Sequence, residues 1–356
     1  MRLAVSLALL AVAASVAAGG TDGPADGATQ PTEIDGCTTI EEPGSYVLTG
    51  DIENASAGRC LRILASDVRL AGDGHRVDGT GGFGTAGVTV GAWGQPVVNV
   101  TVRNLWASDW DDGVRLVAVE DAVVANVTAA RNRIGVLLLN ASDNRLSGVR
   151  ATDNAVHGLS LTDGSDRNRL RDVSAHENAL FGVHLAGGAS GTAIENATAR
   201  GNEYGFALVG ADDNRIVGGA ATGNRIAGVW LSAADDNRVA DLGLSNRFYG
   251  AFLTDRSTNN TLRDNRAADN AVGFRLRNAH ENRLADNLAV EGRDGILLIE
   301  SDRNAVVGNR VLNNRRGVSL LAATDNRFRG NGVRNNERNY IVARGSANNS
   351  VPAGAQ

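Results

Sequence analysis

Three carboxylates, Asp109, Asp111 and Asp112, form the densest acidic group of the sequence and lie close to Trp110 and Arg115. Two carboxylates about 5–9.5 Å apart can hydrolyse a glycosidic bond, and carboxylate oxygens are also ligands that Ca²⁺ prefers. The three residues are therefore candidate catalytic groups of a polysaccharide lyase or hydrolase, or a site for sugar or Ca²⁺. The alternative is a solvated acidic turn in a protein whose net charge is −5.

A second candidate site is a stripe of aromatic and basic residues. Each member lies two positions after a glycine that recurs along the chain, and the alternation of a strand points this position outward. The stripe brings Trp230 beside Phe252, with Arg275 next and with His184 and Arg115 farther upstream. Aromatic rings stack on the apolar faces of sugars and Arg pairs with carboxylates, so the stripe predicts a carbohydrate-binding groove. A stack of rings covered by a turn loop is the alternative.

No metal centre is predicted. A soft metal such as copper needs His, Met or Cys side chains that converge on one point, and Met1 is the only methionine. His157 and His184 lie on neighbouring repeats, but their offset along the strand places them roughly 11 Å apart. The ligand inventory therefore does not support copper or another cofactor, and Ca²⁺ at the acidic group is the one ion left open. The histidines are His75, His157, His176, His184 and His280.

These candidates are positioned by a repeat. Glycine followed three residues later by leucine recurs ten times at intervals of 22 to 24 residues. A second repeated position carries asparagine, mostly in Asp-Asn-Arg-Leu, and in one repeat Gly191 takes its place. Alternation leaves open whether Tyr204 and Tyr249, directly before their glycines, face in or out. The repeated glycines are Gly113, Gly135, Gly158, Gly182, Gly205, Gly228, Gly250, Gly273, Gly295 and Gly317.

Each repeat is too short for a helix and holds three alternating stretches between Asn, Asp and Gly turns. This pattern predicts an all-β fold, a single-stranded parallel β-helix of about a dozen coils stacked about 4.8 Å apart. Aliphatic ladders fill such a core, which explains 42% hydrophobic residues beside only 7 Phe, 4 Tyr and 4 Trp. A leucine-rich-repeat horseshoe is the alternative, but its Leu-x-x-Leu-x-Leu spacing is missing. We expect an N-terminal cap and first coils over 37–112, regular coils over 113–351 and a tail over 352–356.

The N-terminus indicates export. Met1-Arg2 precedes an uncharged apolar run that ends in Val16-Ala17-Ala18, which predicts a signal peptide over 1–18 and a flexible linker over 19–36. A retained membrane anchor is the alternative, and no later segment is long enough to span a membrane. We expect a secreted or extracytoplasmic protein, at the cell surface or in a periplasm-like space.

Two further features fit that compartment. Cys37 and Cys60 are expected to form a disulfide, with a reduced pair as the alternative. The sequence also contains seven Asn-x-Ser/Thr sequons, of which about four would arise by chance in a chain so rich in asparagine. The candidate glycosylation sites are Asn54, Asn99, Asn126, Asn140, Asn196, Asn259 and Asn348.

A second arginine stripe argues against polyanion binding. Most of its members follow an acidic residue by two positions, as Arg145 follows Asp143, so opposite charges are interleaved and an ion-pair surface is predicted. Together with a pI of about 5.6, this excludes nucleic acid as a partner. The stripe contains Arg145, Arg169, Arg215, Arg238, Arg283 and Arg327.

Four segments resemble a known family. These are Cys37-Thr38-Thr39-Ile40, the Pro43-Gly44-Ser45-Tyr46-Val47-Leu48 stretch, Cys60-Leu61-Arg62-Ile63 and the turn Gly72-Asp73-Gly74-His75. With the Asn-rich coils, they resemble the right-handed parallel β-helix proteins of the NosD type. That family belongs to the carbohydrate-binding and sugar-hydrolase (CASH) group of the pectin-lyase-like superfamily. The resemblance implies a right-handed helix over about residues 37 to 351.

The same resemblance implies three roles: maturation of the copper enzyme nitrous oxide reductase beside an ABC transporter, polysaccharide cleavage or epimerisation, and surface carbohydrate binding. Catalytic signatures are missing, because the chain has no Gly-His-Gly with Arg-Ile-Lys, no Asp-Pro-His and no lysine. We therefore expect a protein without catalysis that binds a polysaccharide or cell-envelope glycan, or serves as an envelope scaffold. A NosD-like accessory role is the first alternative and a polysaccharide lyase or hydrolase is the second.

Overall fold

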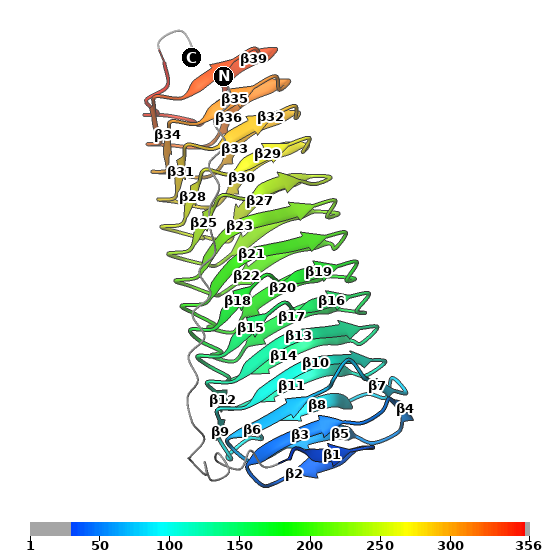
Figure 1. The fold of residues 1–356 in the computed structure, drawn as a ribbon. Helices are drawn as coiled ribbons and strands as arrows, with labels where there is room; N and C mark the ends of the chain where they lie inside the picture. The colour runs from blue at the N-terminus through cyan, green and yellow to red at the C-terminus, as the bar shows by residue number, and fades with distance from the viewer. Residues whose placement is uncertain (1–29, 353–356) are drawn as a thin grey trace, which may run out of the picture. The chain divides into compact units, whose positions relative to one another are not determined.

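The computed structural model describes residues 30–352, which form short strands and turns without an α-helix. The strands stack coil upon coil along the chain (Figure 1). Fourteen of them, one per coil, form a parallel sheet that we call the long sheet. Its strands are β2 (Thr38–Ile40), β5 (Arg59–Ile63), β8 (Ala86–Val90), β11 (Asp112–Val117), β14 (Ile134–Leu139), β17 (His157–Thr162), β20 (Phe181–Ala186), β22 (Tyr204–Val209), β24 (Ala227–Ser232), β27 (Tyr249–Thr254), β30 (Val272–Arg277), β33 (Asp294–Ile299), β36 (Arg316–Leu321) and β39 (Arg338–Val342).

The other sides of the coils belong to a sheet of 23 strands that run in two rows. The first row contains β1 (Thr32–Ile34), β3 (Gly44–Leu48), β6 (Val68–Ala71), β10 (Thr101–Ser108), β13 (Val123–Ala130), β15 (Arg145–Ser147), β18 (Arg169–Arg171), β21 (Ala193–Arg200), β23 (Arg215–Thr222), β25 (Arg238–Ala240), β28 (Thr261–Arg263), β31 (Arg283–Ala285), β34 (Ala305–Val307) and β37 (Arg327–Arg329). The second row contains β4 (Ile52–Ala55), β7 (Arg76–Gly79), β16 (Arg150–Thr152), β19 (Ser174–His176), β26 (Gly243–Ser245), β29 (Arg266–Ala268), β32 (Leu288–Val290), β35 (Arg310–Leu312) and β38 (Gly332–Arg334). The longer strands β10, β13, β21 and β23 run through both rows, and β9 (Val97–Val98) pairs with β12 (Val119–Glu120) in a small third sheet. The predicted parallel β-helix with three strands per coil is therefore confirmed.

Each coil places the same aliphatic pattern inside. The residues one and three positions after the repeated glycine are buried, as Val229 and Leu231 show. Leu231 pairs in register with Leu208 on one side and with Leu253 on the other, so leucine stacks on leucine through the core. The leucine ladder was predicted from the repeat and is confirmed.

The repeated glycine is needed because the coils approach closely at this position. A Cβ atom at Gly250 would lie 2.5 Å from the carbonyl oxygen of Gly273, and one at Gly205 would lie 2.6 Å from that of Gly228. The Cβ position of Gly205 also faces the buried Ala221, so the glycine points into the core. Because the glycine and the next residue both point inward, the residue before the glycine and the residue two after it both point outward.

Buried asparagines connect the coils at the turns. The backbone N–H of Asn237 donates to Oδ1 of Asn260 at 2.9 Å, and its Nδ2 donates to the carbonyl oxygens of Ala211 and Asp235. This ladder was predicted, with one error: Thr192 takes the asparagine position, not Gly191, and its N–H donates to the asparagine of the next coil. Two further ladders were not predicted. They contain Asn132, Asn154, Asn178, Asn202, Asn224, Asn246 and Asn270 in one, and Asn265, Asn287, Asn309 and Asn331 in the other.

The N-terminal cap begins earlier than expected. Strand β1 pairs with β3, so the fold starts at Thr32, inside the segment expected to be a linker. Cys37 and Cys60 form the predicted disulfide. The expected signal peptide over 1–18, the linker up to residue 29 and the tail from residue 353 lie outside the described residues. Between residues 30 and 352, no helix is long and apolar enough to cross a membrane.

Candidate functional site

The outward surface of the long sheet, which we call the outer face, carries two columns of side chains. One column consists of the residues directly before the repeated glycines, and the other of the residues two positions after them. The two columns touch within a coil: Arg115 lies 2.5 Å from Asp112, and the ring centroids of Tyr249 and Phe252 are 4.9 Å apart. Tyr204 and Tyr249, whose direction the sequence left open, therefore face out.

Seven rings gather in the middle of the outer face, and we call them the aromatic strip. Tyr204 stacks on Trp230 with 4.7 Å between centroids, and Trp230 also packs against Phe181 at 6.1 Å. Phe181 is buried, whereas the other rings remain partly exposed. The rings are thus half-buried against one another rather than covered by a loop. The strip consists of His157, Phe181, His184, Tyr204, Trp230, Tyr249 and Phe252.

The predicted pairing of Trp230 with Phe252 holds for the backbone. Their Cα atoms are register partners, but the ring of Trp230 stacks on Tyr204, one coil upstream, and Phe252 packs on Tyr249. The small, buried Ala207 is the register partner of Trp230 on the upstream side and leaves room for this stacking. The strip therefore has an upstream group of rings that ends at Trp230 and a downstream group around Phe252.

The two neighbouring histidines correct a prediction. The ring centroids of His157 and His184 are only 4.9 Å apart, where the sequence suggested roughly 11 Å. The two positions stand side by side because the glycine between the columns points inward. Burial lowers the pKa of His157 to about 3, assisted by His184 and Arg133, and burial lowers the pKa of His184 to about 4. Both imidazoles are neutral near pH 7 and act as further flat rings.

Arg275 continues the strip downstream, as predicted from its position. Its guanidinium carbon lies 5.0 Å from the ring centroids of both Tyr249 and Phe252, and its Nη1 donates a hydrogen bond to the Tyr249 hydroxyl. Cation–π attraction to two rings holds the guanidinium against the strip. Its Nε has no hydrogen-bond partner among the residues that the structure describes.

The three candidate carboxylates at the upstream end all contact arginines. Asp111 and Asp112 share Arg133, at 2.5 and 3.6 Å. Burial raises the pKa of Asp112 although Arg115 opposes this shift. Trp110 beside them is a core residue whose Nε1 donates to the carbonyl oxygen of Val77. The carboxylates are thus held in an ion-pair cluster, which lends no support to Ca²⁺ or to a catalytic pair. The pairs are Asp109 with Arg131, Asp111 with Arg133 and Asp112 with Arg115, each at 2.5 Å.

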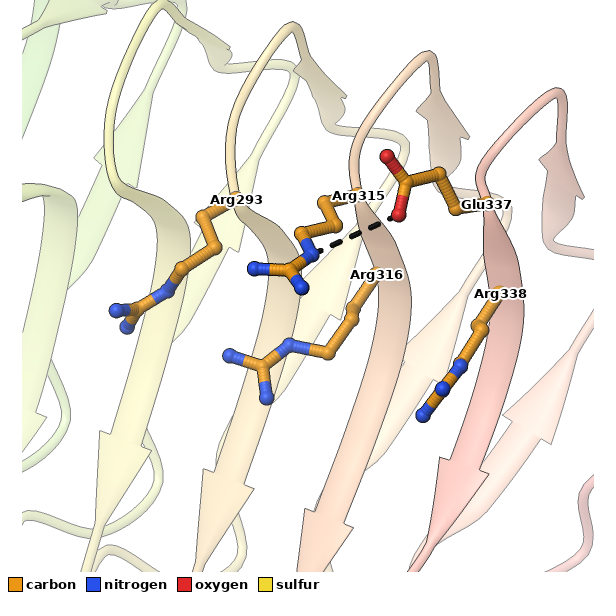
Figure 2. Close-up of a pocket in the computed structure, with 5 residues that line it drawn as sticks. All are labelled: Arg293, Arg315, Arg316, Glu337 and Arg338. Carbon is orange, nitrogen blue, oxygen red and sulfur yellow. Dashed lines mark ion pairs between the residues drawn. The ribbon is translucent and has the colours of Figure 1, made fainter.

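At the other end of the outer face lies a group that the sequence analysis missed. A pocket of about 270 Å³, which we call the arginine pocket, opens on the last coils (Figure 2). The fully buried Asp294 contacts two of its arginines, Arg293 at 3.0 Å and Arg316 at 2.5 Å. A signal was present, because Asp294 and Arg316 precede repeated glycines, as do the rings of Tyr204 and Tyr249. The pocket is lined by Arg293, Arg315, Arg316, Glu337 and Arg338.

Buried polar atoms without a hydrogen-bond partner also concentrate on the outer face. Each of these atoms is itself buried, so the face carries polar groups that its own packing leaves unsatisfied. Between residues 30 and 352 these atoms include Arg62 Nε, Thr89 Oγ1, His157 Nδ1, Trp230 Nε1 and Arg275 Nε.

The turns and the second arginine stripe show no further candidate site. All seven sequon asparagines are exposed and have positive φ angles of 47–56°, a conformation that asparagine adopts more readily than most residues. The turns therefore explain these asparagines without glycosylation, which stays a prediction. Near the second arginine stripe, Asp143 pairs with Arg167 at 2.6 Å, and this hydrogen bond lowers the pKa of Asp143. The region is an ion-pair surface, as predicted, but the partner comes from the turn of the next coil.

Comparison with known proteins places the chain in a family. The model of the family described as periplasmic copper-binding protein (NosD) matches residues 161–288 and 219–352, which together cover more than half of the chain. The model of the right-handed β-helix region matches residues 83–221. The chain belongs to the NosD family of right-handed parallel β-helix proteins. No curated protein matches it significantly.

Solved structures share the fold. The A-module of Azotobacter vinelandii mannuronan C-5 epimerase AlgE4 is 16% identical, covers 87% of this chain and 91% of its own, and superposes with a TM-score of 0.51. The A-module of the epimerase AlgE6 from the same organism is 15% identical, with the same coverage and a TM-score of 0.50. The Dettilon tailspike protein is 12% identical, with 85% of this chain and 59% of its own covered, and a TM-score of 0.50.

The side chains do not fit the copper site that the family's description implies. Both cysteines are in the disulfide, and no group of three or more His, Cys, Asp or Glu side chains in the described part of the chain could hold a metal ion. His157 and His184 adjoin, but the ring that joins them is Phe181, which is no ligand. The family match also gives no support to an ABC transporter as a partner.

Proposed function

We propose that this protein binds an elongated glycan along its outer face, outside the cytoplasm. The aromatic strip carries the proposal, because half-buried rings on consecutive coils offer stacking surfaces along one line. The neutral imidazoles of His157 and His184 extend this surface without adding charge.

The comparisons support the proposal at the level of fold. Mannuronan epimerases, whose A-modules share this fold, act on a polysaccharide. The matched family is described as periplasmic, and the Cys37–Cys60 disulfide is typical of oxidising compartments. These observations favour a location in a periplasm-like space or at the cell surface.

Binding to a panel of soluble polysaccharides, measured by affinity electrophoresis and then by calorimetry, tests the proposal. We expect Trp230→Ala/Phe252→Ala to weaken binding at least about tenfold, because stacked aromatic anchors dominate such interfaces. Trp106→Ala is the matched control, since Trp106 is an exposed tryptophan on β10, away from the long sheet. Undiminished binding by the double variant, or an equal loss in the control, would contradict the proposal.

The same panel tests for turnover. We expect no new reducing ends and no unsaturated products, because each carboxylate at the upstream end is paired with an arginine. Turnover that Asp111→Asn abolishes would instead make the protein a polysaccharide lyase or hydrolase.

A NosD-like role in copper-enzyme maturation is the second candidate, and the family match supports it. If the protein carried copper for that role, purified protein incubated with Cu(I) and desalted would retain about one copper per chain. We expect no such retention, because His157 and His184 lack a third ligand. Stoichiometric copper that His157→Ala/His184→Ala removes would favour the second candidate.

A further inference from the structure

Downstream of the aromatic strip, the outer face becomes basic. Arg275 follows Phe252 in register, and its own register partner on the next coil is Leu297. Each of the next three coils instead adds arginine at or just before the first residue of its long-sheet strand. These are Arg293, then Arg315 and Arg316, then Arg338. The chain as a whole carries a net charge of −5, so such a run of one sign is not a consequence of composition.

The acids of the arginine pocket do not balance its arginines. Asp294 is shared by Arg293 and Arg316, and Glu337 lies 3.5 Å from Arg315, where both side chains are mostly exposed. Four guanidinium groups therefore face two carboxylates. An exposed pair at this distance contributes little, so the pocket holds an excess of positive charge toward solvent.

The arginines also keep donors free. A guanidinium has five N–H groups, and Arg316 donates one hydrogen bond to Asp294, from Nη2. Its Nε lies 2.5 Å from the same carboxylate but has no hydrogen-bond partner among the residues that the structure describes. Figure 2 shows the side chains of Arg315 and Arg316 extending side by side over the neighbouring strand toward Arg293. The buried Asp294 thus holds two guanidinium groups in place, and their remaining edges match the planar oxygens of a carboxylate or the oxygens of a sulfate ester.

The volume and position of the pocket indicate the ligand. About 270 Å³ accommodates an anionic group with part of a sugar ring rather than a whole oligomer. Arg275 stands between the rings and the pocket in the order of the coils, because its guanidinium contacts Tyr249 and Phe252 and its strand β30 pairs with β33, the first strand at the pocket. A chain that stacks on the rings and continues downstream reaches the arginines within a few coils.

Resting on the proposed function, we infer that the glycan is acidic and that its carboxylate or sulfate groups bind in the arginine pocket. A nucleic acid fits less well, since it carries a phosphate at every residue along the whole face, whereas the middle of the outer face is a strip of uncharged rings. The inference places apolar sugar faces on the strip and acidic groups on the last coils.

Calorimetry with matched ligands tests the inference. The probes are hexagalacturonate, its fully methyl-esterified form, a chondroitin sulfate hexasaccharide and a single-stranded DNA hexamer. We expect an acidic hexasaccharide to bind about tenfold more tightly than the neutral ester at low salt, an advantage that screening reduces. A larger gain for the sulfated probe assigns the pocket to sulfate, and a larger gain for hexagalacturonate assigns it to carboxylate.

Substitutions of charged residues test whether the preference for the acidic probe comes from the arginine pocket. Arg315→Gln/Arg338→Gln removes the arginines that do not hold Asp294, so the buried pairs stay intact, and we expect it to lose about the whole preference for the acidic probe. Arg283→Gln/Arg327→Gln is the control, because it removes the same charge from exposed positions on β31 and β37. Glu337→Gln is expected to strengthen acidic binding about twofold by removing the exposed carboxylate.

The outcomes separate the two proposals. Three results would overturn binding in the arginine pocket and leave stacking on the strip intact. The first is equal affinity of the wild-type protein for the acid and the ester. The others are an unchanged preference for the acid in Arg315→Gln/Arg338→Gln, or an equal loss of that preference in the control variant. Loss of preference in Arg315→Gln/Arg338→Gln, with no effect of Trp230→Ala/Phe252→Ala on either probe, overturns the strip instead. Tighter binding of the DNA hexamer than of every glycan, or no binding of any acidic probe, also overturns the inference.

Discussion

The inner and outer sides of the long sheet are made by the same strands but follow different rules. Inside, the position three residues after the repeated glycine is leucine in every regular coil: Leu208, Leu231 and Leu253 are stacked in register, each completely buried. Outside, the same strands carry alanine, tryptophan and phenylalanine at one column position. Stacking of coils restricts only the inner side, so the grouping of rings and then arginines on the outer side requires another cause, and ligand binding supplies one.

The largest effect is expected from breaking the inner side. Leu231→Ala removes a fully buried side chain from the middle of the ladder, and the regular coils above and below cannot collapse into the gap. We expect a loss of about 2–5 kcal/mol in the free energy of unfolding, measured as a shift of the urea midpoint. A loss below about 1 kcal/mol would mean that the core is loosely packed.

The next largest effect is expected at an asparagine ladder. Asn237→Ala removes the acceptor of the Asn214 N–H and the donor to the Ala211 carbonyl, both of which stay buried. Leaving buried polar groups unpaired costs about 1–3 kcal/mol, so we expect a clear fall in the urea midpoint. Arg238→Ala is the control, because Arg238 is the next residue and is exposed, and it should change the urea midpoint little. Asp236→Ala would not serve, because the φ of 58° at this position suits aspartate better than alanine.

These inner features were the ones that the sequence could predict. Glycine and leucine at fixed spacing, and the Asp-Asn-Arg-Leu turns, are direct consequences of stacking, so their period reveals the coil. The ladders through Asn132 and Asn265 escaped because their asparagines stand in varied sequence contexts. Gly191 was mistaken for a ladder residue because only the register shows that Thr192 aligns with Asn168.

Of the two columns of outward side chains, the sequence predicted only one. The column that contains Trp230 and Arg275 follows from simple alternation after the glycine. The column before the glycine does not, because the glycine and its successor both point inward and alternation fails at that step. His157 was therefore placed far from His184, and Asp294 with its arginines was not recognised. The variety of residues before the glycines was the available signal, since buried positions of this fold repeat.

A smaller effect on stability is expected from the two buried histidines of the outer face, and it depends on pH. The folded protein holds the pKa of His157 at about 3 and that of His184 at about 4, below the 6.5 of a free histidine. Between pH 6.5 and 4 the unfolded chain binds protons that the folded chain does not, so stability present above pH 6.5 is lost as the pH falls. We expect the drop in the free energy of unfolding between pH 7 and pH 4.5, measured from urea curves, to be smaller in His157→Gln/His184→Gln, by about 1 kcal/mol after allowance for partial exposure. An equal drop in both proteins would place these rings in water.

The smallest effect on stability is expected at Trp230, the outward neighbour of Leu231, and comparing the two residues tests the two sides of the sheet directly. Trp230 is the larger side chain, but it is only partly buried, its Nε1 has no hydrogen-bond partner to lose, and its ring contacts are to Tyr204 and Phe181 on the same face. We expect Trp230→Ala to cost about 1 kcal/mol or less in the free energy of unfolding, against several for Leu231→Ala, while only Trp230→Ala weakens glycan binding in the folded protein. Urea unfolding and calorimetry on the two variants read both quantities. If Trp230→Ala destabilised the protein as much as Leu231→Ala does, the strip would be part of the core, and the rings would exist to hold the coils together rather than to hold a ligand.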